Sequence, residues 1–263
     1  MKPRFILPIF VSTLLLLFLL HSKLDASVAA NPNRQWTTKQ EVEYFLEQLE
    51  NLQTNRPCIP VSFGEQWGSH HLCARTNKKP CVFFSFGVAD DYNFEKELAQ
   101  QSGCFGYALD PSVSHPTALV PNVTFMQIAA NSLEDNSWHT TTTVPALRRW
   151  LKTDYLPVLK MDCEGCEFAL ARDVASDMPD FWDSVDQFAV EIHVPRLFMK
   201  TKQHLDNYIL LLQQLRKAGL KLAHADIKDC NPKDEATGCL PELVELGYPC
   251  KSRKMCQNFL FAK

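Results

Sequence analysis

The hydrophobic positions of this chain alternate between short β-rich runs and longer stretches with helical spacing. From residue 81 onward the apolar runs predict seven strands, over 81–86, 104–109, 123–129, 156–161, 187–192, 220–224 and 258–262. Helical spacing between them predicts helices over 92–101, 144–151, 167–175 and 204–218. Strands that alternate with helices of this length form right-handed βαβ crossovers. The pattern therefore predicts an α/β fold with a doubly wound, mostly parallel seven-stranded sheet and helices on both faces.

A separate helix and an irregular stretch precede this alternation. The pair Thr37-Thr38 followed by Glu41 is typical of a helix start, and apolar residues then recur at helical spacing through residue 53. Residues 55–80 are rich in proline and glycine and contain Cys58 and Cys73, so we interpret them as an irregular cap stapled to the main domain.

The first 29 residues have the layout of a secretory signal. Lys2 and Arg4 precede an apolar run over 5–20, and the small residues Ser27 and Ala29 follow it. This predicts cleavage after Ala29; left uncleaved, the segment would be a signal anchor and the chain's one contact with a membrane. In both cases the remainder enters the secretory pathway, as a secreted protein or in the Golgi lumen. We divide the chain into the signal (1–29), the N-terminal helix and cap (30–80) and the main domain (81–263).

The number and position of the cysteines agree with a protein of the secretory pathway. All ten cysteines follow Ala29, and an even number in an oxidising compartment indicates disulfide pairing. Local pairs are expected within the C-terminal set of Cys230, Cys239, Cys250 and Cys256. We interpret Cys163 and Cys166 as two small buried side chains, because no second pair of Cys or His completes a zinc site. The sequon at Asn122 is a candidate glycan acceptor.

Charge excludes one class of partner. The chain has 27 basic and 30 acidic residues and a net charge of -3, which leaves no electrostatic footprint for DNA or RNA.

Candidate chemistry gathers where the predicted strands end, which is where doubly wound sheets bind ligands. Gly87 and Ala89 follow the first strand and permit close approach of a ligand, and Asp110 follows the second, where a carboxylate can accept hydrogen bonds from ribose hydroxyls. Asp162 and Glu164 follow the fourth strand. Carboxylates there are expensive to desolvate, so they indicate a polar site.

Three further polar residues accompany this acidic cluster. We interpret Lys160 as a flanking residue and Glu167 as a complement to the dipole of the helix that it opens. His193, at the end of the fifth strand, is the evident general-base candidate.

The run Val158-Leu159-Lys160-Met161-Asp162-Cys163-Glu164-Gly165-Cys166-Glu167 resembles the "LKIDxEGxE" signature of FkbM-type S-adenosylmethionine-dependent methyltransferases. Phe84-Ser85-Phe86-Gly87 is similar to the family's first motif, Ala108-Leu109-Asp110-Pro111 to its second, and Val190-Glu191-Ile192-His193 to the strand after the signature. With the N-terminal signal, the chain most resembles the branch of secreted or Golgi methyltransferase-like proteins.

The resemblance implies a Rossmann-like domain that uses S-adenosylmethionine to methylate a hydroxyl of a glycan or small molecule. It implies cofactor contacts at Ser85, Phe86, Gly87, Ala89, Asp110 and Asp162, with no metal. A hydroxyl acceptor benefits from a base, for which Asp162, Glu164 and His193 are the candidates.

Two other functions stay open. In a lumenal glycosyltransferase, Asp162 and Glu164 would hold Mn²⁺ against a sugar nucleotide. A secreted binding protein would keep the fold without catalysis; Ala89 favours it, because a second glycine often occupies that position in the family's loop.

Overall fold

Eight strands form one sheet in the computed structural model, which describes residues 36–65, 68–74, 81–131, 140–194, 199–228, 240–248 and 256–263. They are β3 (Val82–Phe86), β4 (Phe105–Leu109), β5 (Ala118–Val120), β6 (Val123–Met126), β9 (Leu156–Met161), β10 (Val185–His193), β11 (Lys221–Lys228) and β12 (Cys256–Ala262). Their spatial order is β11-β12-β10-β9-β3-β4-β6-β5. The predicted α/β class and all seven predicted strands are confirmed.

The sheet is parallel at its centre and antiparallel at its margins. β6, β4, β3, β9 and β10 pair in parallel, whereas β12 runs antiparallel to both β10 and β11. The eighth strand, β5, adds antiparallel to β6 at the edge, and three residues are too short a run to predict it. The predicted third strand is too long: it ends at Met126, and β7 (Ala129–Ala130) pairs instead with β8 (Thr141–Thr142).

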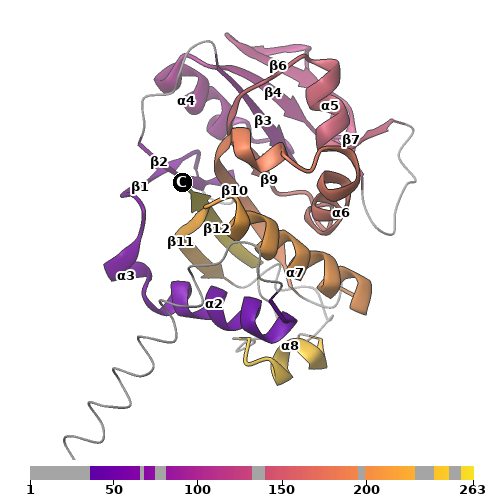
Figure 1. Cartoon of the computed structure of the whole chain (residues 1–263). Coiled ribbons are helices and arrows are strands. Elements are labelled where there is room, and N and C mark those ends of the chain that lie inside the picture. The colour runs from indigo at the N-terminus through magenta and orange to yellow at the C-terminus, as the bar shows by residue number, and fades with distance from the viewer. Residues whose placement is uncertain are drawn as a thin grey trace, which may run out of the picture. The chain divides into compact units, whose positions relative to one another are not determined.

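One face of the sheet is covered by four helices, α2 (Thr38–Glu50), α5 (Val144–Trp150), α6 (Glu167–Asp177) and α7 (Lys202–Lys217) (Figure 1). Alternation along the strands turns Phe84, Phe86 and Phe188 into this core. α2 is fastened to α7 by a buried ion pair, in which Arg216 donates to both carboxylate oxygens of Glu41 at 2.6 and 2.9 Å.

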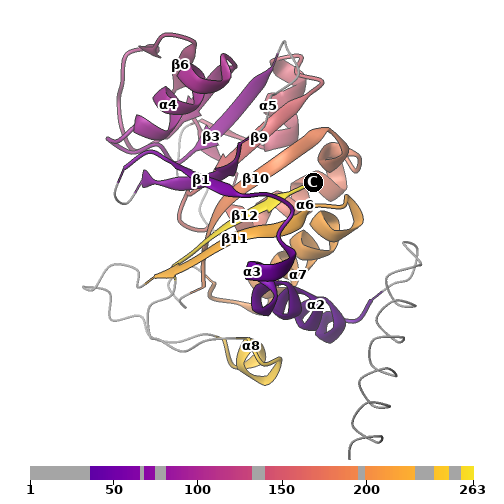
Figure 2. The same cartoon turned by 90° about the vertical axis from the view of Figure 1, so that its left-hand side faces the viewer.

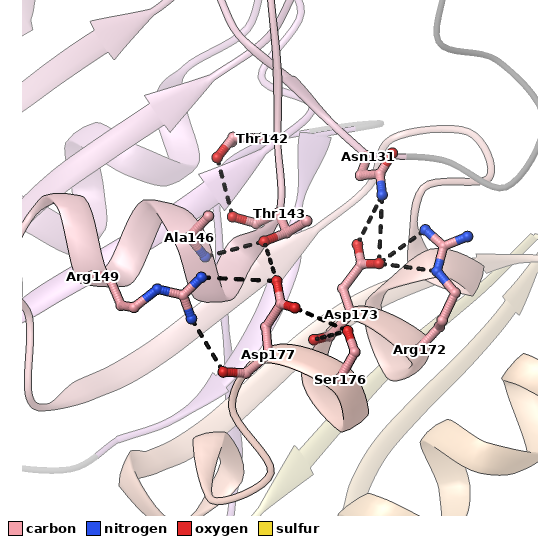
Figure 3. A network of polar contacts seen from close by, with 9 residues as sticks. All are labelled: Asn131, Thr142, Thr143, Ala146, Arg149, Arg172, Asp173, Ser176 and Asp177. Atoms are coloured by element: carbon pink, nitrogen blue, oxygen red, sulfur yellow. Dashed lines mark hydrogen bonds and ion pairs between the residues drawn. The ribbon is translucent and has the colours of Figure 1, made fainter.

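α5 is fastened to α6 by the polar network of Figure 3. Thr143 caps the first turn of α5 and also donates to Asp177 of α6, and Arg149 donates to the Asp177 carbonyl. Asn131, which follows β7, donates to Asp173 of α6. These contacts fix the helices that precede and follow β9.

The other face is covered by α4 (Asn93–Ser102) and by a hairpin of β1 (Pro60–Phe63) and β2 (His70–Cys73). Figure 2 shows β1 in front of the sheet, and β2 contacts β10 and β12. The backbone of Cys73 exchanges two hydrogen bonds with the Gln187 side chain of the main domain. The disulfide Cys58–Cys73 joins two residues of the cap itself, so it is not the predicted staple between the cap and the main domain. The cap is therefore ordered around a hairpin where the sequence predicted an irregular stretch.

Two more disulfides have both partners in the described ranges. Cys81–Cys104 joins the starts of β3 and β4. Cys163–Cys166 closes the turn after β9, so the interpretation of these two residues as unpaired small side chains is wrong. Cys256 is disulfide-bonded, while the predicted signal and the cysteines at 230, 239 and 250 lie outside the described residues.

The remaining described helices are short: α3 (Leu52–Asn55), the 3-10 helix η2 (Phe181–Ser184) and α8 (Pro241–Glu245). Among the residues that the structure describes, none of the helices is long and apolar enough to span a bilayer.

Candidate active site

The order of the strands reverses between β3 and β9, because the chain continues from β3 to β4 on one side and reaches β9 and β10 on the other. Ligands of doubly wound sheets bind in the crevice outside the carboxyl ends of the strands at such a point. Gly87 follows β3 and Asp162 follows β9, and the Asp162 amide donates to the Phe86 carbonyl at 3.0 Å. The predicted site residues Gly87 and Asp162 therefore lie side by side at this crevice.

Gly87 is required by this close approach. Its φ is +77°, and a Cβ at this position would overlap the Asp162 carbonyl group. The predicted close approach to Gly87 exists, but the atoms that approach it belong to the protein's own backbone at Asp162 and not to a ligand.

Two of the predicted cofactor contacts turn their side chains away from the crevice. Ser85 is fully buried and its hydroxyl donates to Oε1 of Glu95, a buried residue of α4, at 2.5 Å. Phe86 packs in the core under the helices. These two residues can face a cofactor only through their backbone.

Lys160 supports the turn after β3 from below. It is buried, and its ammonium donates to the Gly87 carbonyl at 2.5 Å and to the Phe86 carbonyl at 3.3 Å. Burial raises the pKa of the neighbouring Glu95, against the opposing effects of the Lys160 charge and the Ser85 hydrogen bond. The interpretation of Lys160 as a flanking residue is wrong: it is a buried cation beneath the candidate cofactor loop.

Asp110 shapes the same loop from the end of β4. Its Oδ2 accepts the Ala89 amide at 2.8 Å, and its Oδ1 accepts the amide and the hydroxyl of Ser112 at 2.8 and 2.6 Å. Since a carboxylate offers about four acceptor positions, these three bonds leave one for a ligand. The Ala89 carbonyl lies 2.8 Å from Nε2 of His115, and Ala89 itself has a φ of +51°. The loop thus adopts its left-handed turn without a second glycine, which removes the observation that favoured a non-catalytic binding protein.

Asp162 lies between two histidines. Its Oδ2 is 3.4 Å from Nε2 of His70, and its Oδ1 is 3.8 Å from Nε2 of His193. Burial alone would raise the pKa of Asp162, but the His70 hydrogen bond and the charges of Lys160, His70 and His193 hold it well below its usual range. The carboxylate is ionised and its side chain keeps 21% exposure, so a ligand can reach it.

His193 is a buried cation at neutral pH. Burial alone would lower the pKa of His193, but the carboxylate of Glu167, which lies 3.0 Å from Nδ1, and the charges of Asp162 and Glu191 raise it to about 9. A protonated imidazole cannot accept a proton, so the predicted role of His193 as a general base does not fit this environment.

Sequence reasoning missed two residues of this site. Glu167 is fully buried and accepts the amide and Nδ1 of His193 through one oxygen and the Gly165 amide through the other, so it does more than complement a helix dipole. His70 arrives from the hairpin, far from Asp162 in the sequence. Glu164, in contrast, is exposed and has a φ of +54°.

Among the described residues, the groups of three potential metal ligands differ from the acidic pair that the glycosyltransferase hypothesis used. Two groups of three potential ligands occur among these residues, Cys163 with Cys166 and Glu167, and Glu191 with His193 and Cys256. Each contains disulfide-bonded cysteine, which offers no thiolate, and neither includes Asp162 or Glu164.

The fold and the crevice together define an α/β enzyme of the doubly wound, Rossmann-like class with a polar site at its switch point. The family model described as "Methyltransferase domain" matches residues 19–218, about three quarters of the chain. The chain belongs to this family and is a methyltransferase, and the family implies S-adenosylmethionine as the methyl donor.

Two solved methyltransferase structures align with this chain at low similarity. "Human methyltransferase 10 domain containing protein" aligns at 9% identity and a TM-score of 0.34, over 86% of this chain and 83% of its own. "Delta-N METTL16 MTase domain" aligns at 8% identity and a TM-score of 0.33, over 86% and 84%. No curated protein matches the sequence.

Proposed function

We propose that this chain is a methyltransferase of the secretory pathway, similar to the FkbM type, that transfers the methyl group of S-adenosylmethionine to a hydroxyl of a glycan or small molecule. The observation that carries the proposal is the ionised, reachable carboxylate of Asp162 beside the Gly87 turn, at the switch point of the sheet. It stands where a carboxylate would meet both a cofactor held by the turn and an acceptor above β9.

The residues present fit this cofactor. The remaining acceptor position of Asp110 suits a ribose hydroxyl, and the backbone of 87–89 forms a turn that Lys160 and Asp110 hold in place. When bound, the cofactor supplies an electrophilic methyl group on a sulfonium.

The chain's own contribution is to position the acceptor. Methyl transfer is an in-line displacement, so orientation of the attacking oxygen supplies much of the rate. Asp162 accepts a hydrogen bond from the acceptor hydroxyl and so orients the attacking oxygen; its lowered pKa suits this orienting role better than removal of the proton. His70 and His193 fix the orientation of that carboxylate from two sides, and Glu167 holds His193.

The proposed localisation in the secretory pathway is supported by the disulfides and by the exposed sequon. Disulfides form and persist in oxidising compartments, and three pairs lie within the described residues. Asn122 of the sequon is exposed at the apex of the turn between β5 and β6, with a φ of +67°. It lies at the start of β6, at the opposite end of the sheet from Asp110 and Gly87, so a glycan there would leave the crevice open.

The proposal is tested by calorimetric titration of the purified secreted protein with S-adenosylmethionine and S-adenosylhomocysteine. We expect binding that Asp110→Ala abolishes, and that Asp154→Ala, a change of an exposed aspartate before β9, leaves intact. Absence of binding by the folded, disulfide-intact protein would refute the proposal. A glycosidase-sensitive shift that Asn122→Gln removes would test the address separately.

A further inference from the structure

The turn that follows Asp162 is closed by the disulfide Cys163–Cys166. Of the three disulfides, Cys163–Cys166 closes the shortest loop of chain, with a sequence separation of 3 residues against 15 and 23 for the other two. The entropy that a disulfide removes from the unfolded chain grows with the length of the loop that it closes. This bridge therefore contributes least to folding of the three, although it lies beside the site.

The bridge also holds an unfavourable backbone. Between its two cysteines, Glu164 and Gly165 have φ values of +54° and +113°. A side chain in the left-handed region costs conformational energy, and the surroundings must maintain it. Opening the bridge would release Glu164 from this conformation.

The bridge is mechanically connected to the site on both sides. Asp162 precedes Cys163 and faces His70 and His193, while Glu167 follows Cys166 and holds both His193 and the Gly165 amide. The turn is thus linked to the imidazole of His193 through two carboxylates.

We propose that the Cys163–Cys166 disulfide is a reversible exchange site for small thiols of the glutathione class, and that its reduction loosens the active site. Cys163 is partly exposed whereas Cys166 is 4% exposed, so a thiolate reaches the Cys163 sulfur first. The attack forms a mixed disulfide at Cys163 and expels the Cys166 thiolate, which takes a proton. A second thiol attacks the small-molecule sulfur of the mixed disulfide, leaving the Cys163 thiol and a small disulfide. In total, two small thiols are oxidised and one protein disulfide is reduced to two thiols.

The test uses the purified secreted protein in graded mixtures of reduced and oxidised glutathione, with free thiols trapped by alkylation and located by mass spectrometry. We expect Cys163 and Cys166 to be alkylated at ratios that leave Cys81–Cys104, whose cysteines are 3% and 1% exposed, intact. The bridge at the turn opening no earlier than Cys81–Cys104 would overturn the proposal.

Coupling is measured by two readouts. The imidazole resonances of His193 should shift on reduction and return on reoxidation, and this does not depend on the proposed function. The affinity for S-adenosylhomocysteine, which does rest on the proposed function, should fall at least tenfold. The variant Cys163→Ser with Cys166→Ser should show the reduced values of both at every glutathione ratio. His193 resonances that stay unchanged on reduction would overturn the proposal. If these resonances shift on reduction but the oxidised protein binds no S-adenosylhomocysteine, only the proposed function is refuted.

Discussion

Replacing Glu167 with Gln should change how stability depends on pH. The pKa of His193 is about 9 in the folded protein, against about 6.5 for an unperturbed histidine. A raised folded pKa means that the stabilisation is fully present below pH 6.5 and is lost as pH rises through 9. The difference corresponds to about 3 kcal/mol of unfolding free energy, since one pKa unit is about 1.4 kcal/mol. His193 is 6% exposed on its side chain, so solvent screens this interaction little.

Glu167→Gln removes the nearest negative charge and keeps the shape, so the pKa of His193 should move toward its ordinary value. The loss of stability between pH 6.5 and 9 should therefore become much smaller in the variant than in the wild type. At pH 6 the variant should be less stable by about 2 kcal/mol, the scale of a lost hydrogen bond to a charged group.

The assay is urea unfolding at a series of pH values, with the His193 titration followed by NMR. Glu97→Gln is the matched control, because the Glu97 side chain accepts the backbone amide of Gly64 in the part of the chain that the structure describes. Its stability should be lower by a constant amount across the series. Equal pH slopes in wild type and Glu167→Gln would refute the assignment of His193 as a buried cation held by Glu167.

Three other outcomes follow from the same geometry. Gly87→Ala should cost at least about 2 kcal/mol of unfolding free energy by urea titration, because it combines a left-handed φ with overlap of the Asp162 carbonyl. Asp162→Asn should lower kcat at least tenfold in a methyl-transfer assay at saturating cofactor, since about 1.4 kcal/mol of transition-state stabilisation is a factor of ten. Acid should loosen the hairpin. Burial and the charge of His71, whose ring stacks on His224 with the ring centroids 3.6 Å apart, lower the pKa of His224 to about 4. The stability that is present above pH 6.5 should therefore fall as pH drops toward 4, which hydrogen exchange of β2 would follow.

Periodicity was sufficient to predict the sheet, because each central strand is a continuous apolar run and each helix has one apolar face. It failed at β5, whose three residues carry too little pattern, and at the cap, where β1 has two exposed residues and does not alternate as a half-buried strand does. The ends of β3, β4 and β9 were placed correctly, so Gly87, Asp110 and Asp162 meet as expected. Their hydrogen-bond partners could not be predicted, because whether Asp110 faces a ribose or the Ala89 amide depends on a loop conformation that spacing does not define.

The role of Lys160 shows that the type of residue near a strand end predicts the side chain's environment less well than the register of the strand does. A lysine two residues before an acidic cluster is typical of a flanking position, where its ammonium reaches water. In the sheet, Lys160 pairs with Ser85, and strand alternation turns both toward α4 and away from the helices that cover the other face. The ammonium then has no path to solvent, and the Phe86 and Gly87 carbonyls with the nearby carboxylates replace water. The same register brings His70 of the hairpin over the end of β9, so the N-terminal segment completes the site around Asp162 and the domain from residue 81 onward does not hold all of it.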